Sequence, residues 1–205
     1  MPPPGTPRHR ASRPSHPRGN EDKAGPLGTV RLFVAVETPR LTIPELSPLA
    51  EDAPSHITLR FLGDVPELLV PQLGPALERS LRGAPSGSIV LRGLGAFPNT
   101  ERPRVLWAGV VDDGGRLEDL HRRVKEAVEG LGLPPEDHPF HAHVTLARIK
   151  GWARAELARR AIEAHQGEVF ARFTVQAVVL KQSTLKREGA VHRTILSVPL
   201  SPIPS

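Results

Sequence analysis

The chain has 205 residues, of which 39% are hydrophobic and 24% are charged, so its composition is that of a globular protein. It contains no cysteine, which excludes disulfide bridges, thiolate nucleophiles and Cys-ligated zinc or iron–sulfur sites. No apolar run approaches the roughly 20 residues that span a bilayer, and the Pro- and Arg-rich N-terminus lacks the apolar segment of a secretory signal. We therefore expect a soluble, cytoplasmic protein.

The net charge of +5 is distributed unevenly along the chain. Residues 1–26 hold five basic and two acidic side chains, which leaves a charge of only +2 on the rest. A body this close to neutral lacks the general basic field of a histone-like nucleic-acid binder. If nucleic acid is the partner, we expect the protein to hold it at one defined site.

The chain divides into three predicted regions. Residues 1–28 contain seven prolines and almost nothing apolar to bury, so they are expected to form a disordered N-terminal extension. Residues 29–200 carry the patterns of regular structure and form the predicted folded domain, and residues 201–205 form a short C-terminal tail.

Strand and helix patterns alternate irregularly through the folded region. Apolar and β-branched runs predict strands at 30–36, 56–62, 89–94, 105–111, 141–149, 170–180 and about 193–200. Helical spacing of apolar residues predicts helices at about 67–82, 117–131 and 153–165. Many short connections join neighbouring strands. This order indicates an α+β fold with mainly antiparallel sheet and helices on its outer faces.

One four-residue pattern occurs twice. Segments 56–59 (His-Ile-Thr-Leu) and 143–146 (His-Val-Thr-Leu) both read His-apolar-Thr-Leu, and each lies in a predicted strand. Because side chains alternate between the faces of a strand, the histidine and threonine of each copy share one face. The repeat predicts two pseudo-symmetric lobes that face each other across a central cleft.

Two opposed imidazoles suit acid–base catalysis on a phosphodiester. Histidine titrates near pH 6.5, so one ring of the pair His56 and His143 can accept a proton while the other donates one. The hydroxyls of Thr58 and Thr145 can hydrogen-bond the non-bridging phosphoryl oxygens, where charge must be stabilised in the transition state. Such a site needs no metal and no cofactor.

The flanks of the two motifs extend the pattern over almost the whole predicted domain. The segments are 31–36 (RLFVAV), 56–63 (HITLRFLG), 103–109 (PRVLWAG), 140–148 (FHAHVTLAR), 180–183 and the closing strand near 196–200. In this order they resemble the 2H phosphoesterases, and within them the RNA 2′,3′-cyclic phosphodiesterases, also called 2′-5′ RNA ligases. The resemblance implies two lobes around a water-filled cleft.

The same resemblance implies an activity. It predicts metal-independent hydrolysis of RNA 2′,3′-cyclic phosphate ends to 2′-phosphomonoesters, with tRNA halves, other RNA ends or small cyclic nucleotides as substrates. The reverse step would join RNA ends through a 2′-5′ bond. By analogy with the family, His143 is the proton acceptor, His56 is the proton donor, and Thr58 and Thr145 hold the phosphate.

Two arginines are candidate substrate-binding residues. Alternation places Arg60 on the face of Thr58, which favours a phosphate contact, and places Phe61 in the core. Arg148 matches the family pattern but falls on the face of Val144 unless the strand ends or bulges there. A solvated surface arginine is the alternative for each.

The sequence departs from the family near its C-terminus. It contains no tyrosine, and the positions where relatives often have one hold Lys181 and Arg193. A basic contact to phosphate is then expected in place of base stacking. Of the remaining histidines, His121 is assigned to the exposed face of a helix and His192 to a turn.

Two alternative functions stay open. His141 stands two residues before His143, which is a metal-ligand spacing, so both could join His56 in the zinc site of a metal-dependent phosphohydrolase. The other alternative is a non-catalytic RNA-end-binding module. The near-neutral charge of residues 27–205 and the aromatic content of only 4% argue against this alternative. Nothing in the sequence indicates oligomerisation, so a monomer is expected.

Overall fold

The computed structural model describes residues 28–49, 55–186 and 189–202. The predicted N-terminal extension lies outside the described residues except for Gly28, and so do the last three residues of the predicted tail. Within the described ranges, no helix is both long enough and apolar enough to cross a membrane.

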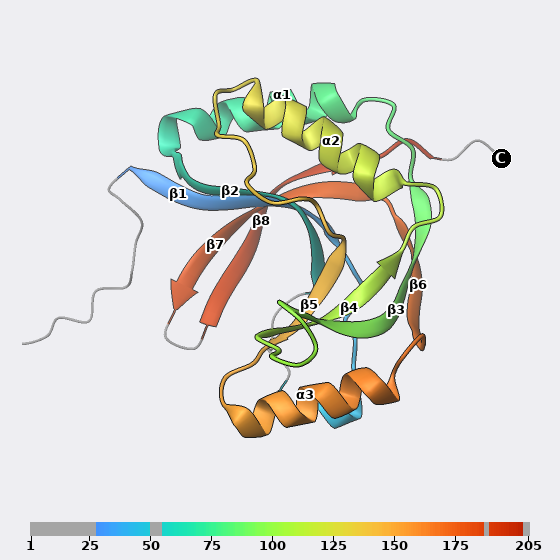
Figure 1. Ribbon diagram of the computed structural model, residues 1–205. Coiled ribbons are helices and arrows are strands. Elements are labelled where there is room, and N and C mark those ends of the chain that lie inside the picture. Colours follow the sequence, from blue (N-terminus) through green and yellow to red (C-terminus); the bar gives the residue numbers. More distant parts are fainter. Residues whose placement is uncertain (1–27, 50–54, 187–188, 203–205) are drawn as a thin grey trace, which may run out of the picture.

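In the described residues, eight strands form one curled antiparallel sheet in the order β6-β3-β4-β5-β2-β1-β7-β8 (Figure 1). The strands are β1 (Thr29–Glu37), β2 (His56–Pro66), β3 (Gly87–Phe97), β4 (Val105–Val111), β5 (His143–Arg148), β6 (Val169–Val175), β7 (Ala177–Lys186) and β8 (Gly189–Pro199). The predicted α+β class and antiparallel pairing are confirmed. The two expected lobes are not separate sheets, however, because β2 and β5 join them into one.

Each half of the sheet has four strands and carries one motif. The first half contains β2, β1, β7 and β8, and the second contains β5, β4, β3 and β6. The second half is one continuous segment of the chain, whereas the first half is assembled from the two ends of the described domain.

The predicted strand 170–180 is two strands. β6 pairs with β3 in the second half and β7 pairs with β1 in the first, although only Gln176 separates them in the chain. Near this point Ser201, which follows β8, exchanges backbone hydrogen bonds with the segment 84–86 before β3. The curl therefore brings the end of β8 in the first half against the start of β3 in the second. No glycine or proline marks the break in the sequence, which is why the pattern predicted a single strand.

Three helices of the described part of the chain cover one face of the sheet. They are α1 (Val70–Leu81), α2 (Arg116–Glu129) and α3 (Trp152–Ala164), with short 3₁₀ turns at Pro44–Leu46 and Glu67–Leu69. α1 and α2 lie side by side, and α3 lies at the other end of the molecule against β3 (Figure 1). The predicted apolar stripe of α2 is buried, and so are the inward residues of the other two helices.

The two sides of β1 enter different clusters. Leu32, Val34 and Val36 join the main hydrophobic core beneath the helices, and we call this side of the sheet the core face. Phe33 and Ala35 point to the other side, where they form a small separate cluster with a valine of β7.

Candidate active site

The two His-x-Thr motifs meet where the halves of the sheet join. β2 pairs with β5 through Ile57 and Val144, the residues that follow His56 and His143. Both apolar side chains have an exposed fraction of 0% and belong to the main core. Because neighbours along a strand point to opposite faces, the histidine and threonine of each motif lie on the face opposite to the helices. We call this side the motif face.

The antiparallel arrangement also determines which motif residues are neighbours. Because the strands run antiparallel, the residue before Ile57 lies across from the residue after Val144, and the residue after Ile57 lies across from the residue before Val144. His56 is therefore across from Thr145, and Thr58 is across from His143. The ladder between β2 and β5 contains this one pair among the described residues, so the strands separate on either side of it. Each histidine is thus the cross-strand neighbour of the threonine of the other motif, at a junction that opens on both sides.

The residues of β1 that pair with His56 and Thr58 also lie on the motif face. Thr58 lies opposite Ala35, and His56 lies opposite Glu37. The ring centroid of Phe33 is 5.0 Å from that of His56. The side chains of the first motif therefore stand over the small apolar cluster and beside a carboxylate.

The second histidine lies in an aromatic cluster. The ring centroid of His143 is 4.9 Å from that of Phe97, in an edge-to-face arrangement, and 6.3 Å from that of Trp107. His141 packs against the same two rings at 5.5 and 5.3 Å. Trp107 lies over Gly95, where a Cβ atom would come within 2.2 Å of the indole, so only glycine leaves room for this cluster.

One nitrogen of His143 is held by the backbone. Nδ1 lies 2.7 Å from the carbonyl oxygen of His141. A carbonyl only accepts, so Nδ1 carries the proton and Nε2 is the acceptor in the neutral ring. Burial lowers the pKa of His143, and the backbone hydrogen bond opposes this shift. The neutral ring is favoured at pH 7, and its accepting nitrogen is the one not bonded to the backbone.

The first histidine has a neighbour that the sequence assigned to a turn. β8 begins at Gly189, so His192 lies in a strand, opposite Ser183 of β7. Its ring centroid is 5.3 Å from that of His56 and 5.0 Å from that of Phe33, edge-to-face in both cases. The predicted turn is wrong because the hairpin of β7 and β8 extends beyond the predicted strand. Extending the period-two pattern backwards from residue 194 would have found this position.

Lys181 lies beside the first motif and is 2% exposed. Its Nζ donates hydrogen bonds to the carboxylate of Glu37 and to Oγ1 of Thr194. The hydrogen bond from Lys181 holds the pKa of Glu37 below its ordinary value, against the effect of burial, and attraction to His56 acts in the same direction. The lysine expected to contact phosphate is thus already paired with a carboxylate.

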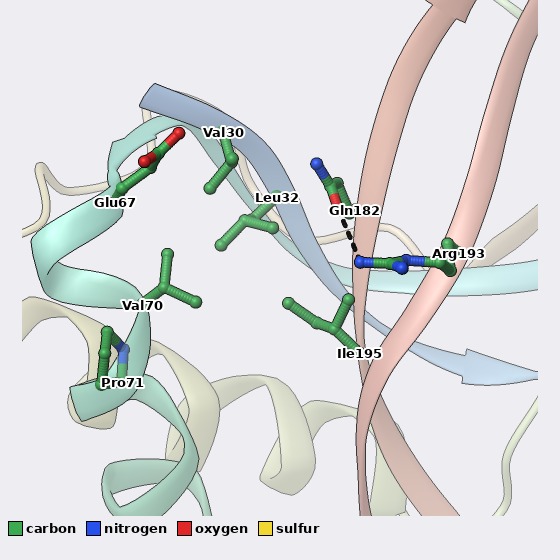
Figure 2. Close-up of a pocket in the computed structure, with 8 residues that line it drawn as sticks. All are labelled: Val30, Leu32, Glu67, Val70, Pro71, Gln182, Arg193 and Ile195. Carbon is green, nitrogen blue, oxygen red and sulfur yellow. Dashed lines mark hydrogen bonds between the residues drawn. The ribbon is translucent and has the colours of Figure 1, made fainter. Parts of the chain in front are cut away.

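The side chain of Arg193 lies on the opposite face of β8 from that of its neighbour His192. Its side chain donates to Gln182 at 3.4 Å, and both residues line a cavity of about 420 Å³ (Figure 2). Leu32 and Val70 line the same cavity, and Leu32 belongs to the core face. Arg193 is therefore not brought together with the motifs.

A β-bulge at Leu59 reverses the predicted faces of the next two residues. The register of β2 against β1 shifts at Leu59, so Arg60 comes opposite Val34 of the core face. Arg60 is 4% exposed, whereas Phe61 is 64% exposed. The predicted common face of Arg60 and Thr58 is therefore wrong, and so is the predicted burial of Phe61, because the extra residue interrupts the alternation.

A β-bulge at Leu146 has the opposite consequence for the second arginine. The register of β5 against β4 shifts at this residue, so Ala147 turns into the core opposite Leu106. Arg148 then shares the motif face with Thr145, and it is exposed. The bulge that Arg148 was expected to need in order to reach the motif face is therefore present.

The alternative metal site was expected to combine His56, His141 and His143. Among the residues that the structure describes, no three histidine, aspartate or glutamate side chains form a group placed to hold a metal ion. His141 and His143 lie close together, with ring centroids 6.1 Å apart. His56 of β2 does not form a metal-ligand set with them.

Comparisons with known proteins agree on one family. A family model described as the 2′-5′ RNA ligase superfamily matches residues 31–186. The RNA 2′,3′-cyclic phosphodiesterase of Aeropyrum pernix is 41% identical over 152 residues, which cover 72% of this chain and 83% of the relative. The enzyme of the same name from Archaeoglobus fulgidus is 32% identical over 180 residues, covering 81% of this chain and 98% of the relative.

Solved structures show the same fold. A crystal structure of a Thermus thermophilus protein matches with a TM-score of 0.65 at 28% identity, covering 83% of this chain and 97% of that one. Escherichia coli LigT in its apo form matches with a TM-score of 0.66 at 21% identity, covering 85% of this chain and 99% of that one.

Proposed function

The chain belongs to the 2′-5′ RNA ligase superfamily, and on this basis we propose that it hydrolyses RNA 2′,3′-cyclic phosphate ends to 2′-phosphomonoesters. The curated relatives bear the name of this activity, which supports the substrate class. The observation that carries the proposal is the pairing of Ile57 with Val144, because it places both motifs side by side on one face. The substrate phosphate would lie in a cleft over this junction.

In the proposed reaction His143 accepts the proton of the attacking water. Nε2 is its accepting nitrogen, and the lowered pKa of the ring supports the neutral state that an acceptor needs. As the water oxygen bonds to phosphorus, the bond from phosphorus to the ribose 3′ oxygen breaks. His56 donates its proton to that oxygen, and the nearby carboxylate of Glu37 supports the protonated state that a donor needs.

The remaining motif residues would stabilise the phosphoryl oxygens. Thr58 and Thr145 are proposed to donate hydrogen bonds to the two non-bridging oxygens, where negative charge increases in the transition state. Arg148 is proposed as a further phosphate contact, since the bulge in β5 puts it on the motif face. Arg60 is not part of this set, because its side chain lies on the core face.

The same groups would serve 2′-5′ ligation if an RNA 5′-hydroxyl replaced water as the nucleophile. His143 would accept the proton of that hydroxyl, and His56 would again donate a proton to the leaving ribose 3′ oxygen, so each histidine keeps its role. Water competes with this hydroxyl, so ligation requires that a bound RNA end hold the hydroxyl at high effective concentration. tRNA halves and small cyclic nucleotides are the substrates to compare, because only the former supply a second RNA end.

The test is hydrolysis of a short RNA ending in a 2′,3′-cyclic phosphate, in EDTA, with the product assigned by ³¹P NMR. A 2′-phosphate is the expected product, and His138→Ala, in an exposed loop, is the control for general effects of losing a histidine. A 3′-phosphate would overturn the assignment of the leaving oxygen. Activity that required added zinc or manganese would overturn the metal-independent mechanism, and binding without turnover would favour an RNA-end-binding module.

A further inference from the structure

We propose that Arg60 is a positioning residue that sets how the two His-x-Thr motifs stand relative to each other, acting from the core face behind them. The inference rests on the proposed function, since it concerns the geometry of that site. Alternation made Arg60 a candidate substrate contact or a solvated surface residue, whereas the structure places it 4% exposed among residues that lead to the second motif.

The junction between the halves is the weakest ladder of the sheet. β2 and β5 are joined by one residue pair, whereas every other pair of neighbouring strands in the described chain is joined by at least four. The proposed chemistry needs one histidine from each side of this junction. Backbone pairing alone therefore gives little control over the angle at which the two motifs meet.

Arg60 bridges this junction from the first half. Its Nη2 donates to the carbonyl oxygen of Pro134 at 2.5 Å, and its Nη1 lies 3.5 Å from Oε1 of Glu136. Glu129, at the end of α2, lies 3.9 Å from Nη2. Pro134 and Glu136 belong to the segment that connects α2 to β5 and ends at His143. The residue that follows the first motif thus binds the segment that leads into the second.

His121 of α2 completes the connection. Its Nδ1 donates to the carbonyl oxygen of Leu59, the bulged residue, at 2.8 Å, and its Nε2 lies 3.9 Å from Oε2 of Glu136. Its ring stacks on Phe140 with centroids 4.5 Å apart and planes within 8°. The side chain is 16% exposed, so the predicted exposed position of His121 is wrong. We call Arg60, His121 and Glu136 the clamp.

The physical properties of the clamp suit orientation better than stability. Taking an arginine out of water is costly, and a buried ion pair often stabilises a protein no more than apolar residues of the same size would. A guanidinium, however, donates hydrogen bonds in a fixed planar geometry, so it holds its acceptors in defined directions. Misplacing a catalytic group by about 1 Å can lower a rate by about 10²-fold. A clamp behind the junction is placed to prevent such an error.

The test compares Arg60→Gln with a matched control, Arg31→Gln. Arg31 pairs with Asp64 at 3.0 and 3.1 Å between β1 and β2, at an exposed position away from the junction of β2 and β5. We expect Arg60→Gln to lower kcat by about 10- to 100-fold with KM within about threefold, and Arg31→Gln to leave both within about twofold. Arg60→Lys should recover only part of kcat, because lysine keeps the charge and lacks the planar donors. An Arg60→Gln protein that is folded and retains kcat within twofold would overturn the proposal.

A second variant covers the case in which Arg60→Gln does not fold. Glu136→Gln keeps the hydrogen bond between Arg60 and Pro134 and removes only the charge, so we expect a decrease in kcat of about 3- to 10-fold with unchanged thermal stability. Unchanged kcat in this variant would overturn the proposal. Loss of rate that follows only the unfolded fraction would do so as well.

A distance measurement separates the clamp from the proposed activity. The chain has no cysteine, so spin labels can be attached at T184C in the first half and K150C beside the second, both at exposed positions. We expect the distribution of distances between the labels to broaden in Arg60→Gln and not in Arg31→Gln. If the wild-type protein does not hydrolyse cyclic phosphate ends, the proposed function fails while this readout still tests the clamp. An unchanged distribution in Arg60→Gln would overturn the clamp whatever the activity.

Discussion

The two His-x-Thr motifs occupy equivalent places in the two halves of the sheet, yet their surroundings differ. His143 is packed against the rings of Phe97 and Trp107, whereas His56 lies opposite the carboxylate of Glu37, which is paired with the buried Lys181. An apolar environment disfavours a charged imidazole, and a nearby carboxylate favours it. The difference is consistent with the proposed roles, proton acceptor for His143 and proton donor for His56.

The equivalence of the halves continues beyond the threonines. In each half the β-bulge falls on the leucine of the motif, the next residue turns to the core face, and the residue after it returns to the motif face. These positions are Leu59, Arg60 and Phe61 in β2, and Leu146, Ala147 and Arg148 in β5. The position that turns into the core is thus an alanine in the second half and the arginine of the clamp in the first.

Removing either imidazole should have the largest effect on this pair of motifs. His56→Ala and His143→Ala are each expected to lower kcat by about 10³- to 10⁴-fold, because each removes one proton-transfer group. Both rings are only half-buried, so the fold should persist. Rates on an RNA with a cyclic phosphate end, together with circular dichroism melts, measure both effects. A variant that lost its fold along with its activity would assign that ring a structural role.

Removing a threonine hydroxyl should have a smaller effect. Thr58→Ala and Thr145→Ala are each expected to lower kcat by about 10²- to 10³-fold, as for other single donors to a developing anion. Serine at either position should restore most of the rate, since it keeps the hydroxyl. Thr174→Ala, at an exposed position of β6, is the control. Equal rates for the alanine and wild-type proteins would remove that hydroxyl from the proposed site.

The pH profile tests the difference between the two histidines directly. A proton acceptor must be neutral, so kcat/KM should rise with pH through the lowered pKa of His143, below 6.5, and fall at higher pH when His56 loses its proton. Glu37→Gln removes the negative charge opposite His56 and leaves the buried ammonium of Lys181 without its carboxylate, so the alkaline limb should move to lower pH. The acid limb should stay in place. Movement of the acid limb alone would reverse the assigned roles.

The lowered pKa of His143 should also make the free energy of unfolding depend on pH. Below pH 6.5 the unfolded chain binds a proton at His143 more readily than the folded chain does, so the free energy of unfolding should decrease as the pH falls. His143→Gln cannot bind this proton and should lose that part of the pH dependence. Urea unfolding between pH 5 and pH 8 measures the effect, and identical slopes in both proteins would contradict it.

The smallest effect is expected at His192. His192→Phe keeps an aromatic ring against His56 and Phe33, so kcat should stay within about threefold of the wild-type value and the alkaline limb should shift little. His192→Ala removes the ring and should lower kcat somewhat more, because His56 loses a packing partner. Rates at several pH values compare the two variants. A large loss in the phenylalanine variant would show that the imidazole itself takes part in the reaction.

The sequence predicted the parts of the site that depend on local pattern. The repeat of His, Thr and alternating apolar residues placed both motifs on strands with their polar side chains on one face, and the structure agrees. The amphipathic stripe of α2 was predicted for the same reason, since helical periodicity is visible within one segment. The pairing of Ile57 with Val144 could not be predicted in the same way, because pairing between residues 87 positions apart leaves no local pattern in the sequence.

The incorrect predictions share a physical cause. Leu59 and Leu146 are ordinary strand residues, and nothing in their side chains indicates that each is an extra residue in its ladder. The bulges arise from pairing with neighbouring strands, and they changed the faces of Arg60 and Arg148. His192 was misplaced because the hairpin of β7 and β8 extends further than its apolar residues suggested. Long-range register decided each of these positions.

The nesting of one half within the other has a consequence for biosynthesis. A ribosome releases β3, β4, β5 and β6 as an uninterrupted stretch, so the half with the second motif can assemble while the C-terminal strands are still being translated. β1 and β2 emerge first, but they must wait for β7 and β8 before their half is complete. The half that begins the folded domain is thus the half that finishes last, and a chain truncated before residue 177 would carry both motifs on an incomplete sheet.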